Sequence, residues 1–308
     1  METDRIRRYE QAAELLPPRL RRLALELPDV QKERVEEFRL RVRAPLTVST
    51  AEGEQSVCPE GRDILVTRED LEQMVSGVTE FSRYASVETL RQGYLSVRGG
   101  FRIGVCGTAV LRDGAVCNVK DFSSLAVRIV REQIGIGERF VPNMFDDAGR
   151  FRSTLILSAP GGGKTTLLRD LVRCLSLGMG GYRSLRVAVV DERSEVAMCF
   201  HGQPQMELGA KTDVLDGCPK ALGIPMLLRA MTPQVIAVDE LSSRADVEAV
   251  CRAANCGVGL LATAHAESVE ELRRKEIWKE LFGAEVFKTV ICINCSGGER
   301  NYQTEELT

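Results

Sequence analysis

The sequence predicts an α/β protein with a P-loop nucleotide-binding core on a parallel sheet, preceded by a small α+β domain. A short apolar run at 155–157 leads through three glycines into Lys164 and a helical pattern, the strand, loop and helix of a P-loop. From there strand-like and helix-like segments alternate, which is typical of a parallel sheet. The residues before 138 instead show short helices followed by period-two alternation, which indicates a separate α+β unit.

The chain has 308 residues, a length that favours two domains. We expect an N-terminal domain over 1–137 and the ATPase domain over 138–308, with the stretch from Glu138 to Arg150 as the junction. The formal net charge of -3 and the isoelectric point near 5.7 argue against a protein built to coat nucleic acid. The Arg-rich first fifty residues are interleaved with Glu and Asp, which favours a solvated helical face over a binding patch.

The cysteines and the lack of long apolar runs indicate a cytoplasmic protein. No run approaches the ~20 residues that a membrane helix needs, and no secretion signal is apparent at the start of the sequence. The ten cysteines are scattered rather than spaced as a disulfide framework, so we expect reduced thiols. Cys292 and Cys295 form a C-x-x-C pair, but the chain has only two histidines and the pair lies in an alternating pattern, which favours a plain strand over a zinc site.

The N-terminal domain is expected to begin with one or two short helices over residues 4–27, broken by Pro17 and Pro18. Alternation from Val35 to Val48 predicts strands around a turn. Thr67 to Asp70 predicts a capping box ahead of a helix over 71–78, and a second helix is expected over 87–92. Strands at 94–97, 101–109 and 126–130 complete a unit that we expect to be PAS-like or KH-like.

In the ATPase half, strands are expected at 155–157, 185–190, 235–238, 259–262 and 286–293. Helices are expected at 167–175, 224–231, 246–255 and 268–281, and the segment from 204 to 223 reads as a long connection with turns. The polar tail after Ser296 is expected to fray.

The P-loop chemistry explains each residue type in the loop. Glycines let backbone N–H groups turn around a phosphate, and the helix N-terminus adds its positive dipole. Lys164 is predicted to reach the β- and γ-phosphates of ATP, and Thr165 to offer its hydroxyl to Mg²⁺. We therefore expect nucleotide binding by Ser158, Ala159, Pro160, Gly161, Gly162, Gly163, Lys164, Thr165 and Thr166. Ser158 departs from the pattern, because the usual first residue of the motif is glycine.

Acidic and imidazole side chains follow other strands of the predicted sheet, at the edge where a parallel sheet binds its ligand. Asp239 and Glu240 end one apolar strand, the type of pair that holds a magnesium-bound water and polarises an attacking one. The run from Asp191 to Glu195 follows another strand. His265 follows a third strand, where a residue that senses the γ-phosphate would lie.

Taken in order, the blocks SAPGGGKTT, VVDERSE, LLRAMTPQVIAVDE and ATAHA resemble the secretion-superfamily ATPases of type II and type IV systems. Closest is a sporulation family of spore-forming Bacillota, with the same DERSE block and a similar GYLSVRGGFRIGVCGTAVL segment. The resemblance implies a RecA-like motor domain, a hexameric ring and a place at the mother-cell face of the channel to the forespore. We also expect an AAA+ classification.

The same resemblance implies roles for individual residues. Asp191, Glu192 and Glu195 match the Asp box, Glu240 the Walker B glutamate and His265 the His box. Arg102 and Arg128 match arginines with which the N-terminal domain reaches the nucleotide, and Arg229 lies in the helix before Walker B. Asp191 and Glu192 reverse the order common in secretion ATPases, so Asp191, Glu192 and Glu240 all remain candidates for the general base. No four-cysteine insert of the type II enzymes is present, so no metal beyond Mg²⁺ follows.

The leading hypothesis is therefore an Mg²⁺-dependent ATPase that assembles with itself, and with membrane components of a secretion-like complex, to energise a channel during sporulation. We expect it in the cytoplasm at the mother-cell membrane, held there by partners. One alternative is a nucleic-acid-binding ATPase, which the negative charge and the lack of an aromatic-rich sheet motif count against. Another is a scaffold that binds ATP with little turnover, which Ser158 and the reversed acidic pair leave open.

Overall fold

The computed structural model describes residues 2–57, 64–79, 90, 93–296 and 299–307. The chain forms two compact units, Met1–Arg131 and Glu132–Thr308. The expected domain boundary after residue 137 lies six residues beyond this division. Among the helices in the described ranges, none is both long and apolar enough to cross a membrane.

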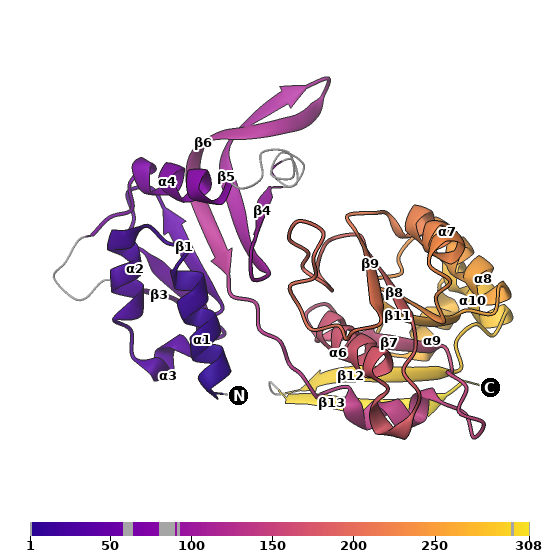
Figure 1. Ribbon diagram of the computed structural model, residues 1–308. Coiled ribbons are helices and arrows are strands. Elements are labelled where there is room, and N and C mark those ends of the chain that lie inside the picture. Colours follow the sequence, from indigo (N-terminus) through magenta and orange to yellow (C-terminus); the bar gives the residue numbers. More distant parts are fainter. Residues whose placement is uncertain (1, 58–63, 80–89, 91–92, 297–298, 308) are drawn as a thin grey trace. The chain divides into compact units, whose positions relative to one another are not determined.

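Unit 1 is an antiparallel sheet with helices packed on one face (Figure 1). Its strand order is β3-β2-β1-β6-β5-β4. Tyr9 and Leu20 from the helices pack with Phe38 and Ile103 from the strands in one core. The elements are α1 (Glu2–Ala13), α2 (Pro18–Leu25), α3 (Asp29–Lys32), β1 (Glu37–Arg41), β2 (Thr47–Thr50), β3 (Gly53–Ser56), α4 (Arg68–Thr79), β4 (Tyr94–Val97), β5 (Phe101–Arg112) and β6 (Ala115–Arg128).

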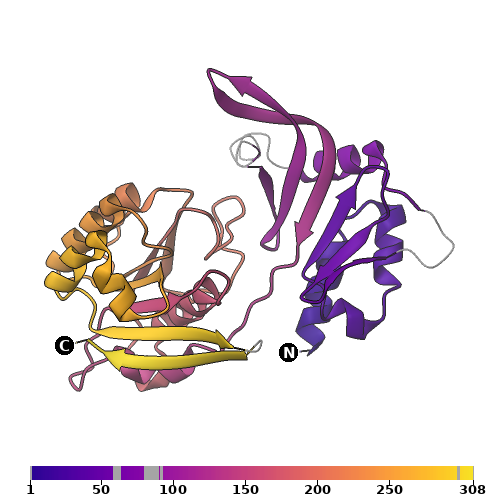
Figure 2. The same cartoon turned by 180° about the vertical axis from the view of Figure 1, so that it is seen from behind.

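The local signals of unit 1 are confirmed where the structure describes them. The proline pair separates α1 from α2, and Thr67 and Asp70 exchange the two hydrogen bonds of a capping box at the start of α4. The β5–β6 hairpin is longer than expected and projects beyond the other strands, as Figures 1 and 2 both show. β3 was not predicted, and the expected helix at 87–92 lies largely outside the described residues.

Unit 2 is a largely parallel sheet with the strand order β13-β12-β7-β11-β10-β8-β9, in which only β13 runs antiparallel to its neighbour. Helices α7 to α10 cover one face of the sheet, and α6 with η1 covers the other. The elements are η1 (Glu138–Met144), β7 (Thr154–Ser158), α6 (Lys164–Leu177), η2 (Met179–Gly181), β8 (Val187–Asp191), β9 (Thr212–Asp216), α7 (Lys220–Ala230), β10 (Val235–Val238), α8 (Arg244–Asn255), β11 (Gly259–His265), α9 (Val269–Arg274), η3 (Glu276–Trp278), α10 (Lys279–Gly283), β12 (Thr289–Ser296) and β13 (Glu299–Glu306).

Four expectations for unit 2 differ from the structure. The stretch from Glu138 to Arg150, expected to join the two domains, belongs to unit 2, where η1 buries Phe140 and Met144 in the core beside α6. The tail after Ser296 does not fray but returns as β13, paired along β12 (yellow in Figure 2). The connection from 204 to 223 contains the edge strand β9. In addition, the helix expected over 268–281 is divided into α9, η3 and α10.

Candidate active site

The P-loop joins β7, which ends at Ser158, to α6, which begins at Lys164. Gly163 has a φ of 101°, a left-handed conformation that other residues rarely adopt. A Cβ atom on Gly162 would lie 1.8 Å from the Oγ of Ser158, so the serine fits only because residue 162 has no side chain. The 14-residue helix α6 presents its free N–H groups and positive dipole end at this loop, an arrangement that favours a bound anion.

Lys164 folds back over the loop and is only 5% exposed. Its Nζ donates to the carbonyl oxygens of Ser158 and Ala159, both at 3.0 Å, and lies 2.9 Å from the Nδ1 of His265. Burial lowers the pKa of Lys164, although the charges of Asp239 and Glu240 act in the opposite direction.

His265 lies between Lys164 and Glu240. An ammonium group can only donate, so the Nδ1 of His265 must accept from Lys164, and its Nε2 carries the ring proton of a neutral imidazole. That Nε2 is 2.5 Å from the Oε1 of Glu240, so His265 donates to the carboxylate. The structure thus brings three of the residues predicted from sequence into one hydrogen-bonded chain.

Asp239 follows β10 and faces two hydroxyl groups. The hydroxyl of Thr165 donates to its Oδ2, and that of Thr263 to its Oδ1, both at 2.6 Å. The Thr263 hydroxyl also accepts the backbone N–H of Glu240 at 2.8 Å, which holds the turn after β10. A threonine hydroxyl next to an aspartate carboxylate is an oxygen set that suits Mg²⁺. The geometry therefore fits the metal predicted from Thr165 and Asp239.

Glu240 is held from two sides. His265 contacts one carboxylate oxygen, and the Nη1 of Arg193 lies 2.8 Å from the other. Burial alone would raise the pKa of Glu240, but the hydrogen bond from His265 and the positive charges of Arg193 and Lys164 hold that pKa below its ordinary value. Arg193 was not predicted as a site residue, because only the acidic members of the DERSE block match the Asp box.

Asp191 has a different environment from Glu240. It is 2% exposed, and its carboxylate accepts the backbone N–H groups of Glu195, Val196 and Ala197 at 2.8–3.0 Å. Burial raises its pKa against the effect of these hydrogen bonds. From the other side, Arg169 of α6 donates to the carbonyl oxygens of Glu195 and Val196. The loop after β8 is therefore held by hydrogen bonds to the Asp191 carboxylate on one side and to Arg169 of the P-loop helix on the other.

Glu192 points to another partner. Its carboxylate pairs with the buried Lys220 at the start of α7, at 2.5 Å. Asp191, Glu192 and Glu240 were the candidates for the general base. Of these three carboxylates, only Glu240 is hydrogen-bonded to His265, which in turn contacts Lys164.

Arg300, on β13, is a residue near the P-loop that was not predicted from the sequence. Its Nε donates to the carbonyl oxygen of Gly162 at 3.0 Å, and its side chain lies against Gly163. Arg300 was not considered as a site residue because the segment after Ser296 was expected to fray. An arginine of the same unit therefore contacts the P-loop backbone.

Arg102 and Arg128 lie on unit 1, where they are direct partners in the register of β5 and β6. Both lie on the face away from the helices, since the next pair in the register, Ile103 with Val127, is buried in the core on the opposite face. The guanidinium of Arg102 stacks 4.3 Å from the ring of Tyr94.

Arg229 does not join the P-loop group. It lies on α7 beside Arg186 and Gly259, at the edge of the sheet where the strands begin.

Comparison with known proteins shows which proteins this chain is similar to. The family model described as "Sporulation stage III, protein AA" matches residues 6–303. The stage III sporulation protein AA of Bacillus subtilis is 35% identical over 276 residues, which cover 87% of this chain and 86% of that protein.

Among solved structures, the Legionella pneumophila ATPase DotB is similar with a TM-score of 0.58 and 15% identity, over 89% of this chain and 76% of that one. The pilus retraction motor PilT with bound ADP gives a TM-score of 0.59 and 18% identity, over 89% and 79%. The predicted RecA-like fold and the resemblance to secretion ATPases are confirmed. The AAA+ expectation is wrong, because these motors form a different class.

Proposed function

Since the chain belongs to the sporulation stage III protein AA family, we propose that it is an Mg²⁺-dependent ATPase that works as a motor during sporulation. One observation supports this most: Lys164 of the P-loop is linked through His265 to Glu240. A residue that binds phosphate, one that senses it and one that accepts a proton are the parts needed to hydrolyse ATP.

Binding would begin at the P-loop. The backbone N–H groups at the start of α6 hold the phosphates, and Lys164 exchanges its carbonyl and imidazole partners for β- and γ-phosphate oxygens. Thr165 and Asp239 would hold Mg²⁺, which neutralises negative charge on the phosphates when bound. Thr165 and Thr263 fix the orientation of the Asp239 carboxylate before the nucleotide arrives.

Glu240 is the proposed general base. Its lowered pKa keeps it ionised at neutral pH, so it can accept a proton from the attacking water. The water oxygen then bonds to the γ-phosphorus, the bond to the β-phosphate oxygen breaks, and ADP and phosphate leave. Because Lys164 and Glu240 share His265, a shift of Lys164 toward the phosphates changes the hydrogen bonding of the base. We propose that Asp191 and Glu192 are positioning residues. Asp191 accepts backbone N–H groups of the loop after β8, and Glu192 pairs with Lys220.

We further propose a hexameric ring in which Arg102 and Arg128 complete the site on assembly. A loose phosphoryl-transfer transition state carries charge that Lys164 alone does not neutralise, and an added arginine is worth ~10³–10⁵ in rate in P-loop enzymes. The exposed placement of Arg128 supports such a role. The ring would act at the mother-cell face of the channel to the forespore, recruited by membrane partners.

The proposal is tested by measuring phosphate release from ATP by the purified full-length chain with Mg²⁺, with the Lys164→Ala variant as the baseline. Turnover that needs Mg²⁺ and exceeds the baseline supports an ATPase. ATP binding without turnover above the baseline, at every protein concentration, would instead support a nucleotide-binding scaffold.

A further inference from the structure

A hollow of about 650 Å³ lies at the edge of the unit 2 sheet where β8, β10 and β11 begin, opposite the P-loop edge. Its wall carries an unusual concentration of one side chain. We call it the arginine hollow, after Arg150, Arg183, Arg186 and Arg229, and its apolar surface includes Phe151 and Val258.

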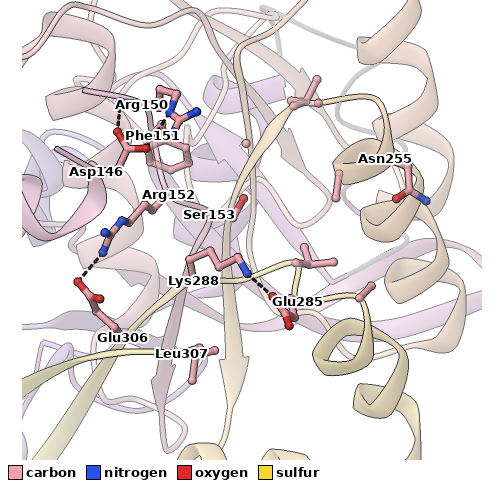
Figure 3. Close-up of a pocket in the computed structure, with 16 residues that line it drawn as sticks. Asp146, Arg150, Phe151, Arg152, Ser153, Asn255, Glu285, Lys288, Glu306 and Leu307 are labelled. Carbon is pink, nitrogen blue, oxygen red and sulfur yellow. Dashed lines mark hydrogen bonds and ion pairs between the residues drawn. The ribbon is translucent and has the colours of Figure 1, made fainter. Parts of the chain in front are cut away.

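A neighbouring hollow on the same edge provides a comparison within the same protein. Figure 3 shows it, with Arg150 and Phe151 shared between the two. Here the basic groups are matched by carboxylates, as the dashed lines mark in the picture. The ion pairs are Arg150 with Asp146, Arg152 with Glu306 and Lys288 with Glu285. On this side, then, the fold neutralises the charges that it places around the cavity.

The arginine hollow is not neutralised in this way. No aspartate or glutamate lines it, and Arg150 is its single arginine with a carboxylate partner in the described part of the chain. Arg186 and Arg229 donate instead to the carbonyl oxygens of Thr232 and Pro225. Arg183 is exposed and has no hydrogen bond or ion pair with any residue that the structure describes.

We propose that the arginine hollow is a docking site for an acidic peptide segment of a partner protein. Guanidinium groups bind carboxylates with two parallel hydrogen bonds, and arginine clusters are a recurring way to recognise acidic motifs. Several arginines distributed around a cavity with apolar surface suit successive side chains of an extended segment better than one small anion. The chain as a whole carries a charge of -3, so a polyanion is attracted here rather than to the surface in general.

The location also fits a partner. Because the hollow and the P-loop lie at opposite edges of the sheet, a segment bound there leaves the nucleotide site free. The inference goes beyond the proposed ATPase, and its binding test does not depend on turnover.

The probe is a fluorescein-labelled peptide of ten glutamates, with binding to the full-length chain followed by fluorescence anisotropy at fixed salt. The test variant is Arg183→Gln with Arg186→Gln, and the matched control is Arg152→Gln in the neighbouring, neutralised hollow. Both affected arginines of the test variant are exposed, so it should fold normally, as checked by circular dichroism and by unchanged ATP binding. We expect the test variant to bind the peptide about tenfold or more weakly, and the control within about twofold of the wild type.

Equal binding by the test variant and the wild type, or an equal loss in the control, would overturn the proposal. Two further experiments test whether the arginine hollow binds a different kind of anion instead of an acidic peptide. Displacement of the peptide by inorganic phosphate at equal concentration would point to a small phosphate site and contradict the proposal. A membrane site would give a different result: the wild type would bind vesicles of anionic lipid, the double substitution would abolish that binding, and the peptide would not bind. This result would also contradict the proposal.

Discussion

The Nζ of Lys164 lies 2.9 Å from the Nδ1 of His265, although 101 residues separate them in the chain. The register of the sheet explains the contact, because His265 on β11 is the direct partner of Ser158 at the end of β7. The two strands therefore deliver the start of the P-loop and the imidazole to the same point. Since His265 also contacts Glu240, one side chain links the Lys164 ammonium group to the proposed base.

Replacing Lys164 by Ala should reduce ATP turnover by at least about 100-fold, because it removes the cation of the P-loop that binds the β- and γ-phosphates. Phosphate release under saturating ATP measures this. A conservative Lys164→Arg variant serves as a further check, since a larger guanidinium cannot take the same position between Ser158 and His265 and should also be impaired. Turnover like the wild type in Lys164→Ala would refute the assignment of the site.

Replacing Glu240 by Gln should leave ATP binding within a few-fold of normal and reduce hydrolysis by about 100-fold or more. The amide keeps the shape of the side chain but cannot accept the proton of the attacking water. Fluorescent-nucleotide titration and phosphate release separate the two effects. Glu192→Gln is the matched control, because Glu192 pairs with Lys220 rather than with His265. If the control loses hydrolysis and Glu240→Gln retains it, the base lies in the loop after β8.

Replacing Asp191 by Asn should destabilise the protein by about 3 kcal/mol. The carboxylate accepts three backbone N–H groups in a buried position, and an amide nitrogen would face at least one of them donor to donor. Urea unfolding measures the change, with Glu248→Gln, which removes only an exposed ion pair with Arg244 on α8, expected to cost less than about 1 kcal/mol. Normal stability with lost turnover would instead make Asp191 a catalytic residue.

Replacing Arg300 by Ala should weaken ATP binding about three- to tenfold. The side chain donates to the carbonyl oxygen of Gly162, and a hydrogen bond from a charged group to a loop backbone holds the loop in its binding conformation. Nucleotide titration measures the effect. Asn301→Ala, an exposed neighbour on β13, should bind normally, and an equal loss there would mean that the strand rather than Arg300 is responsible.

Much of the site was predictable because a P-loop is a local pattern and the ends of parallel strands share an edge. Lys164, Thr165, Asp239, Glu240 and His265 were identified in this way, and the structure brings them together. Buried strands such as β7 and β10 were equally clear from their short apolar runs, which fits the burial of every residue in them.

The rest depended on tertiary contacts that a local pattern does not contain. β13 is an edge strand with the sequence ERNYQTEE, whose polar side chains give no period-two signal, so it and Arg300 were missed. Asp191 reads as one more acidic strand end, and only its burial and its three N–H partners separate it from Glu240. Similarly, η1 contains Pro142 and resembles a linker until its apolar residues are seen beside α6.

Arg102→Ala and Arg128→Ala should each lower the turnover number by about 10³-fold if they complete the site on assembly, while ATP affinity and fold are kept. If the arginines reach the P-loop of a neighbouring chain, turnover per chain of the wild type should also rise with protein concentration as the complete site forms. Arg112→Ala, near the tip of the same β5–β6 hairpin, is the matched control and should remain active. The decisive comparison is a fragment that begins at Glu132, the start of unit 2. Hydrolysis by this fragment at the full-length rate would show that no arginine of unit 1 takes part.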